Sequence, residues 1–481
     1  MKRGFLNHPR PTGNVSTCVP PANSRIENMV SLPIGKDPNV VQLPFDKFAT
    51  WISEVSEIPA LTFSESDPHK GSPQDALIII TTLPIGAPHD EPVSECVFHP
   101  GSKEVVMAIP NFPRPLLRPK AVAFRLGPAP GKGLGLFSTR ALKMGELIHC
   151  ERPLLVGATS IPSYAPASFT REMFIQHYLN ESEQYFQVAV NRMRPADKAA
   201  FMALANSHTR DGSGPIMGII RTNALTISGL RPGVTDPSKD YSGICEVMSR
   251  LNHSCSANTC PRFDLPSFSF RLYAVRDIAE GEELTYSYVD PLASAAQRQQ
   301  GLRPYDLVCT CAACTDPATS DPRRAAIKTF SPDTVKWALD PQLPDNWLIR
   351  QCLDQLVRIT KEGMGHNPQC FFATKTIMEA YICLGDAEQA SKWAVKLFQQ
   401  IWTEGYDDEF ATPSEFKALV DPKNVAVYTD HLLWRTRFDP AAYGGLQIYQ
   451  LASEMSRSDD VDTVQVFVGP YSLTLDRVLS N

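Results

Sequence analysis

The stretch Arg250-Leu-Asn-His-Ser-Cys-Ser-Ala-Asn-Thr-Cys260 decides how the rest of this 481-residue chain is interpreted. It places an amide, an imidazole, a hydroxyl and a thiol at successive positions, Asn252 to Cys255. A packed core rarely tolerates so many polar groups unless each of them has a partner. The stretch is therefore either a solvated loop or part of a chemical site, and its own composition does not separate the two.

A second stretch, Cys309-Thr-Cys311-Ala-Ala-Cys314, favours a site. It supplies three thiols at the spacing of metal ligands, one short of the four that a closed tetrahedral zinc site uses. Cys255 is the obvious fourth ligand, and an ion held in this way would join the two stretches. His253 is a competing ligand, and an incidental cluster of cysteines is the alternative to a metal site.

Bulk composition sets the broad class of the protein. The length is too great for one compact core, and 46 basic against 52 acidic residues leave a net charge of −6, so we expect no direct binding of nucleic acid. Twelve cysteines at irregular positions, without an apolar leader, indicate a reducing compartment, the nucleus or the cytoplasm or both. The apolar runs have strand length and predict no membrane span.

The chain divides into segments of different character. Residues 1–40 lack periodicity and are expected to be disordered, and residues 41–120 form an accessory region of short apolar segments without a recognisable function. Residues 325–481 are predicted to form a helical C-terminal domain. Within it, residues 373–397 have either the pattern of a tetratricopeptide-like unit or that of an ordinary helical bundle.

Between these segments the sequence predicts strands joined by a glycine turn. Gly131, Gly133 and Gly135 allow positive φ and a close approach of the backbone to a ligand. No convincing helix follows, which argues against a dinucleotide or phosphate loop. Further along, Tyr286 and Tyr288 lie two residues apart and so share one face of a strand.

Four of these features occur in the order found in SET-domain protein lysine methyltransferases. They are the Gly131-x-Gly133 turn, the stretch Asn252-His-Ser-Cys-x-x-Asn258, the strand Gly281-Glu-Glu-Leu-Thr-x-Ser-Tyr288 and the Cys-x-Cys-x2-Cys cluster. The chain resembles this family, and most of all its SET and MYND class, over residues of about 120–316. It departs from the family at Ala257, where a proline is usual, and it shows no separate MYND zinc finger.

The resemblance implies an α+β fold. Residues 121–316 would form a SET-type β-clip core of short strands, with a helical insertion at about 157–215 and a zinc-bound post-SET segment at the cysteine cluster. One structural zinc would be held by four thiolates, those of Cys255, Cys309, Cys311 and Cys314.

The resemblance also assigns roles to single residues. The cofactor S-adenosyl-L-methionine would be bound by Lys132, Gly133, Leu134, Asn223, Ser249, Asn252 and His253. Tyr288 matches the catalytic tyrosine, and Tyr286, Tyr305 and Leu307 would line or support the substrate channel. An aliphatic Leu307, where an aromatic residue is common, would make that channel wider or less selective for a cation. Asn223 is alternatively a buried amide that the backbone satisfies.

The function implied is the transfer of methyl from S-adenosylmethionine to a lysine side chain of a protein substrate, histone or non-histone, by a monomeric enzyme. The alternative is a catalytically weak, SET-like zinc-binding scaffold for protein–protein interaction. A nucleic-acid-binding zinc protein finds no support, because no basic patch interleaved with aromatic residues is evident in the sequence.

Overall fold

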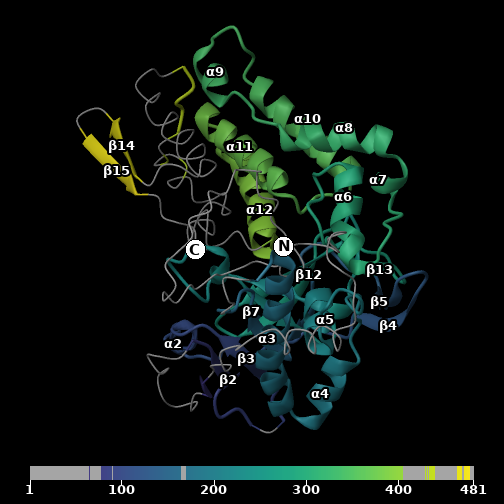
Figure 1. The fold of residues 1–481 in the computed structure, drawn as a ribbon. Coiled ribbons are helices and arrows are strands. Elements are labelled where there is room, and N and C mark those ends of the chain that lie inside the picture. Colours follow the sequence, from purple (N-terminus) through teal and green to yellow (C-terminus); the bar gives the residue numbers. More distant parts are fainter. Residues whose placement is uncertain are drawn as a thin grey trace.

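The structure is a computed structural model, and it describes residues 64–65, 77–88, 90–163, 169–404, 428, 431 and 433–438, with the strands 463–468 and 471–476. Figure 1 shows a β-rich part, coloured purple to teal, beneath a part built of green helices. Among the helices in these ranges, none combines the length and the apolar character that a bilayer crossing requires.

The described strands form three small sheets and a separate hairpin. The first sheet has the order β1 (Ser64–Glu65), β2 (Ile79–Leu83), β3 (Ser94–Phe98), β7 (Leu155–Ala158), β9 (Tyr241–Ile244) and β8 (Leu225–Ile227). The second has the order β10 (Asn252–His253), β13 (Glu283–Tyr286), β5 (Gly133–Ser138) and β4 (Phe124–Ala129). The third consists of β11 (Thr259–Asp264), β12 (Ser269–Ala274) and β6 (Leu147–Glu151). Short strands together with helices agree with the α+β fold expected from the sequence.

The described part of the predicted accessory region, residues 41–120, is not separate from the central fold. Its strand β3 pairs in parallel with β7 through Cys96 and Val156, and β2 pairs antiparallel with β3. Helix α2 (Ser102–Met107) follows β3. The reason lies in burial, because all five residues of β3 are buried and need neighbours on both sides. The prediction of disorder for residues 1–40 lies outside the described residues.

Much of the described part of the insertion predicted at about 157–215 lies in helices, which continue to Asn223. Helices α3 (Arg171–Arg192), α4 (Pro195–Met202) and α5 (Pro215–Asn223) make up this part. Thr170 caps α3 by accepting a hydrogen bond from the amide of Met173. Helix α3 packs directly on the first sheet, since a Cβ at Gly157 would lie 2.3 Å from the ring of Phe186.

The chain after β13 is mainly helical in the described residues up to Glu404. The helices are α6 (Ala295–Leu302), α7 (Ala312–Thr315), α8 (Pro317–Lys328), α9 (Thr334–Leu339), α10 (Trp347–Lys361), α11 (Pro368–Leu384) and α12 (Ala387–Glu404). The turn between α11 and α12 is made by Gly385 at φ 75°, a conformation that glycine adopts without strain. Whether these helices form true repeats stays a prediction.

The prediction of helices for the whole of residues 325–481 is wrong for one segment. Residues Thr463–Val468 and Tyr471–Asp476 form an antiparallel hairpin, β14 and β15. In the first of these segments, Val464, Val466 and Val468 alternate with other residues. This period of two and the β-branched side chains favour a strand over a helix.

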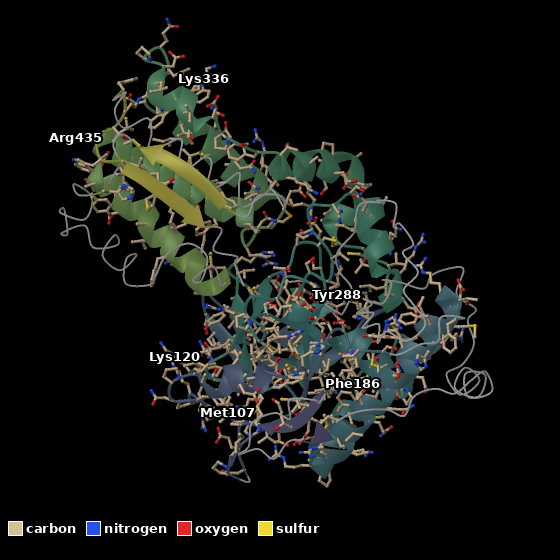
Figure 2. All side chains as sticks on the ribbon, turned by 60° about the vertical axis from the view of Figure 1, so that its left-hand side comes forward. Met107, Lys120, Phe186, Tyr288, Lys336 and Arg435 are labelled. Atoms are coloured by element: carbon tan, nitrogen blue, oxygen red, sulfur yellow. The ribbon has the colours of Figure 1, made fainter. Side chains whose placement is uncertain are left out.

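The largest apolar cluster joins the three small sheets. It contains Ile79 of the first, Leu136 of the second and Leu272 of the third, each at most 1% exposed. Tyr286 and Tyr288 belong to the same cluster. Burial of a side chain of this size contributes about 1.5–3 kcal/mol, so the two tyrosines are packed into a core shared by the three sheets. Figure 2 shows Tyr288 near the boundary between the β-rich part and the green helices.

Candidate active site and metal centre

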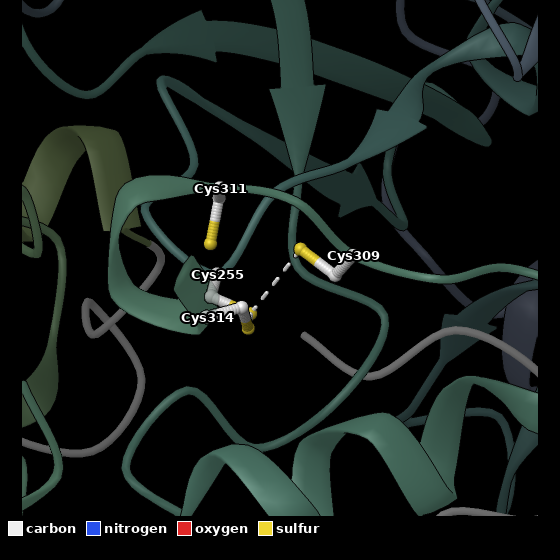
Figure 3. A group of neighbouring side chains, drawn as sticks. All are labelled: Cys255, Cys309, Cys311 and Cys314. Carbon is white, nitrogen blue, oxygen red and sulfur yellow. Dashed lines mark hydrogen bonds between the residues drawn. The ribbon is translucent and has the colours of Figure 1, made fainter. Parts of the chain in front are cut away.

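Four cysteines from distant parts of the chain meet at one point (Figure 3). Cys255 follows β10, and Cys309, Cys311 and Cys314 come from the segment that leads into α7 and from α7 itself. Their sulfur atoms all lie within 4.8 Å of one another. The Sγ of Cys255 lies 3.8 Å from that of Cys309 and 3.5 Å from that of Cys314.

These separations fit a metal site. A tetrahedral site with Zn–S bonds of about 2.3 Å places its sulfurs about 3.8 Å apart, whereas a disulfide needs about 2.05 Å. Hydrogen bonds from Cys255 and Cys309 hold the pKa of the Cys311 thiol well below its usual range. The group of four thiols is compatible with one zinc ion.

His253 connects this group to the segment directly after β13, which carries Tyr288. Its Nε2 lies 3.2 Å from the Sγ of Cys255, and its Nδ1 accepts a hydrogen bond of 3.0 Å from the main-chain amide of Tyr288. The imidazole is buried, with 3% of the residue exposed. The imidazole thus points at the sulfur of Cys255 on one side and at the main-chain amide of Tyr288 on the other.

The strand pairing brings the two polar stretches together. Strands β10 and β13 run in parallel, with Asn252 opposite Thr285 and His253 opposite Tyr286. Asn258 reinforces the contact, because its amide nitrogen donates to the carbonyl of Glu283 at 2.8 Å and its oxygen accepts from the amide of Thr285 at 2.8 Å. This pairing could not be deduced from the sequence, which shows the two stretches thirty residues apart without a connecting hairpin.

Three tyrosines form a continuous aromatic group. The ring of Tyr288 lies 5.1 Å from that of Tyr286 and 5.0 Å from that of Tyr305, measured between centroids. The hydroxyl of Tyr288 donates to the carbonyl of Leu251 at 2.6 Å. Leu307 is half-buried against the same core cluster. All the residues predicted for catalysis and for the channel therefore lie in one region.

The glycine turn has the predicted form. Strands β4 and β5 make a hairpin in which Gly131 and Gly133 have φ of 72° and 75°. The space beside both glycines is open, since a Cβ at either position would meet nothing within 4 Å. A ligand can therefore approach the backbone of Lys132, Gly133 and Leu134.

Glu283 is a site residue that sequence reasoning missed. Its carboxylate binds the ammonium of Lys132 at 2.9 Å and accepts from the amide of Asn252 at 2.8 Å. Asn252 also donates to the carbonyl of Leu134 at 3.2 Å. The sequence offers one weak signal for Glu283, a carboxylate in a predicted strand next to the apolar Leu284. These contacts join the glycine turn and the polar stretch around one acidic group.

Asn223 and Ser249 serve the backbone in this structure. The amide nitrogen of Asn223 donates to the carbonyls of Ala205 and Ile219 at 2.6 and 2.7 Å. The hydroxyl of Ser249 donates to the carbonyl of Asn223 at 3.1 Å and accepts from the amide of Cys245 at 3.0 Å. Asn223 was interpreted either as a cofactor-binding residue or as a buried amide that the backbone satisfies, and these contacts support the second interpretation.

Arg221 lies in a buried polar group on α5. Its guanidinium binds the carboxylate of Asp211 at 2.8 Å, and Nδ1 of His208 lies 2.5 Å from the same carboxylate. Burial opposes ionisation of Asp211, but the hydrogen bond from His208 and the charge of Arg221 hold its pKa well below the usual range. All three side chains are buried, and their contacts hold the segment before α5 against that helix.

Comparison with known proteins defines the class. Residues 133–289 match the SET domain family. This range contains the third sheet, all of the second sheet except β4, the stretch Arg250–Cys260 and Tyr288. The chain thus carries a SET domain.

The domain is related to those of the SET5 and SMYD3 histone-lysine methyltransferases. The chain is 28% identical over 193 residues to histone-lysine N-methyltransferase set5 of Schizosaccharomyces pombe, over 40% of this chain and 50% of the relative. It is 29% identical over 163 residues to histone-lysine N-methyltransferase SMYD3 of Mus musculus, over 33% of this chain and 38% of the relative. The chain spans half or less of the length of these relatives.

A solved structure also aligns with the chain, at a low score. It is described as ctPRC2 in an autoinhibited conformation bound to S-adenosylmethionine. The TM-score is 0.20 and the identity 12%, over 68% of this chain and 34% of the other. A likeness at this level carries no argument about the site.

Proposed function

We propose that the chain is an S-adenosylmethionine-dependent protein-lysine N-methyltransferase. The observation that carries this proposal is the parallel pairing of β10 with β13 inside the SET domain, which sets Asn252 and His253 beside Tyr286 and Tyr288. The names of the relatives support lysine in a protein, histones included, as the acceptor.

The residues around the glycine turn suit the cofactor. The open backbone at Lys132, Gly133 and Leu134, the carboxylate of Glu283 and the amide of Asn252 would hold its amino acid part. When bound, S-adenosylmethionine supplies a methyl carbon on a sulfonium, to which the lone pair of the lysine amine bonds while the carbon–sulfur electrons return to sulfur. The chain's own residues need to align the two reactants and exclude water.

Tyr288 is suited to orienting the amine. Its hydroxyl donates to the carbonyl of Leu251, which fixes the direction of the phenol oxygen, an atom able to accept from an N–H donor. The faces of Tyr286 and Tyr305 beside it attract a cationic side chain. The lysine must lose a proton to water before it reacts, because an ammonium group has no lone pair.

We also propose that one structural zinc is held by Cys255, Cys309, Cys311 and Cys314. The sulfur separations support it. The ion would clamp the segment that carries Tyr305 onto the polar stretch. Metal analysis of the purified protein should find about one zinc per chain, and Cys311→Ser with full metal content would rule out this ligand set.

The experiment that tests the activity uses labelled cofactor. The purified protein is incubated with methyl-labelled S-adenosylmethionine and a whole-cell extract, in parallel with a Tyr288→Phe variant. Label on a lysine of a protein, located by mass spectrometry and lost with the variant, supports the proposal. Label of equal strength with both proteins would contradict it. We place the enzyme, as a monomer, in the nucleus or the cytoplasm, which fractionation of cells and light scattering would check.

A further inference from the structure

Arg298 is a buried cation directed at the cysteine group. It lies on α6, and its side chain is 0% exposed. One terminal nitrogen donates to the carbonyl of Ala313 at 3.1 Å and lies 3.5 Å from the Sγ of Cys314. The other donates to the carbonyl of Ala293 at 2.5 Å and reaches Asp321 only at 3.4 Å. A guanidinium stays charged at all pH values of interest, so this site holds a positive charge with one long contact to a carboxylate.

A second buried arginine provides the contrast. Arg324 is also 0% exposed, but it pairs with the buried carboxylate of Glu362 at 2.9 Å. It donates to the carbonyl of Cys255 at 3.0 Å and not to a sulfur. Of the two, only Arg298 has a sulfur as a hydrogen-bond partner in the described part of the chain. Its charge therefore needs a different counter-charge.

The proposed metal centre would supply that counter-charge. Four thiolates and one divalent ion carry a net charge of −2, and a buried anion of this kind is unfavourable unless cations and N–H donors surround it. Hydrogen bonds to ligand sulfurs also tune a metal site. Arg298 offers both a charge and an N–H donor to Cys314.

Helix α6 also shapes the cysteine segment. Gln299, next to Arg298, donates to the carbonyl of Leu307 at 2.8 Å and accepts from the amide of Cys309 at 3.2 Å. Ser294 and Gln297 cap the start of the helix with reciprocal hydrogen bonds. Helix α6 therefore contacts Cys309 through Gln299 and Cys314 through Arg298.

We infer that Arg298 is the charge-compensating residue of the metal centre, which makes the affinity for zinc depend on a guanidinium outside the four ligands. The inference rests on the zinc site proposed above. It gives helix α6, which carries none of the four cysteines, a part in holding the metal.

The test measures zinc affinity by competition with a chelator of known affinity, at fixed pH, on proteins shown to be folded by circular dichroism. Arg298→Met should weaken zinc binding at least tenfold, and Arg298→Lys should restore part of the loss because it keeps the charge. Arg323→Met is the matched control, since Arg323 is exposed on α8 and contacts Glu362 at 3.4 Å. That control should bind zinc as the wild type does.

A second readout covers the case in which Arg298→Met does not fold. In the cobalt-substituted proteins, Arg298→Lys should shift the thiolate-to-metal absorption band relative to the wild type, because the N–H bond to Cys314 is altered. The inference, but not the zinc site, would be overturned if the wild type carries its full metal load and the folded Arg298 variants show an unchanged band and unchanged zinc affinity. A wild-type protein that binds no metal would overturn both the inference and the proposed zinc site, whereas the methyl-transfer proposal has its own test.

Discussion

The main-chain amide of Tyr288 donates to Nδ1 of His253 at 3.0 Å. An amide can only donate, so Nδ1 must be the acceptor and the ring proton of the neutral imidazole lies on Nε2. That nitrogen is 3.2 Å from the Sγ of Cys255. One histidine therefore links a candidate metal ligand to the backbone of the candidate catalytic residue.

Replacement of His253 should lower both the stability of the fold and the retention of zinc. His253→Ala leaves the buried amide of Tyr288 without its acceptor, so we expect the free energy of unfolding to fall by about 1–3 kcal/mol. Zinc should also be lost more readily, because a donor to Cys255 is gone. Urea denaturation and metal analysis measure the two effects.

Tyr288→Phe is the control for this change. It keeps the amide and His253 and loses only the hydroxyl bond to Leu251, worth about 1 kcal/mol. It should retain its zinc. A His253→Ala protein with wild-type stability and full zinc would refute the proposed link.

Glu151 should make stability depend on pH. Its carboxylate accepts from the amides of Val247 and Met248 at 3.1 and 2.6 Å, directly before the polar stretch. Burial raises the pKa of Glu151 from 4.5 to about 7. Between these values the folded state binds more protons than the unfolded state, so the contribution of this group is complete below pH 4.5 and is lost as the pH rises through about 7.

Glu151→Gln should remove this dependence. The unfolding free energy of the wild type relative to the variant should fall by roughly 2 kcal/mol between about pH 5 and about pH 8. The Nε2 of neighbouring His149 lies 3.7 Å from the Glu151 carboxylate, but burial lowers the pKa of this histidine to about 4, so it is neutral in both folded proteins over this pH range. Urea titrations at the two pH values measure the difference, and parallel pH profiles for the two proteins would count against it.

Gly135 should be needed for cofactor binding. A Cβ at this position would lie 2.8 Å from Nδ2 of Asn252 and 2.9 Å from Oε1 of Glu283, so Gly135→Ala must displace the pair. We expect the affinity for S-adenosylmethionine, measured by titration calorimetry, to fall at least tenfold, equivalent to about 1.4 kcal/mol.

The matched control lies directly across the hairpin. Gly127 pairs with Gly135 in the sheet, and a Cβ there would meet only the end of the Arg125 side chain, at 2.7 Å, and the ring of Phe137 at ordinary distance. Because Arg125 is exposed and flexible, Gly127→Ala should bind cofactor nearly as the wild type does. Equal losses in both variants would mean that general damage to the hairpin, and not the Asn252 pair, sets the affinity.

Local patterns account for what the sequence alone could predict. The spacing of Cys309, Cys311 and Cys314 and the glycine turn are short-range features, and the structure has them as expected. Glu283 and Arg298 escaped notice because a charged residue in a strand or on a helix is ordinary until its partners are known. Their partners, Lys132 and Cys314, are 151 and 16 residues away.

Long-range pairing explains the errors in the fold. The parallel contact of β3 with β7 joins Cys96 to Val156, and no local pattern encodes it. The resemblance to SET domains assigned His253 to the binding of the cofactor. The structure turns its imidazole to the sulfur of Cys255, since the parallel register of β10 and β13 places the amide of Tyr288 on its other side.

The central claim is that Tyr288 acts on the amine while the cofactor is held elsewhere. Methyl transfer from labelled S-adenosylmethionine to the lysine substrate should be measured for wild type and Tyr288→Phe at saturating cofactor, with cofactor affinity measured in parallel. We predict an unchanged cofactor affinity and a loss of turnover of at least a hundredfold, about 2.7 kcal/mol in the barrier. Turnover equal to that of the wild type, at equal cofactor affinity, would contradict the account.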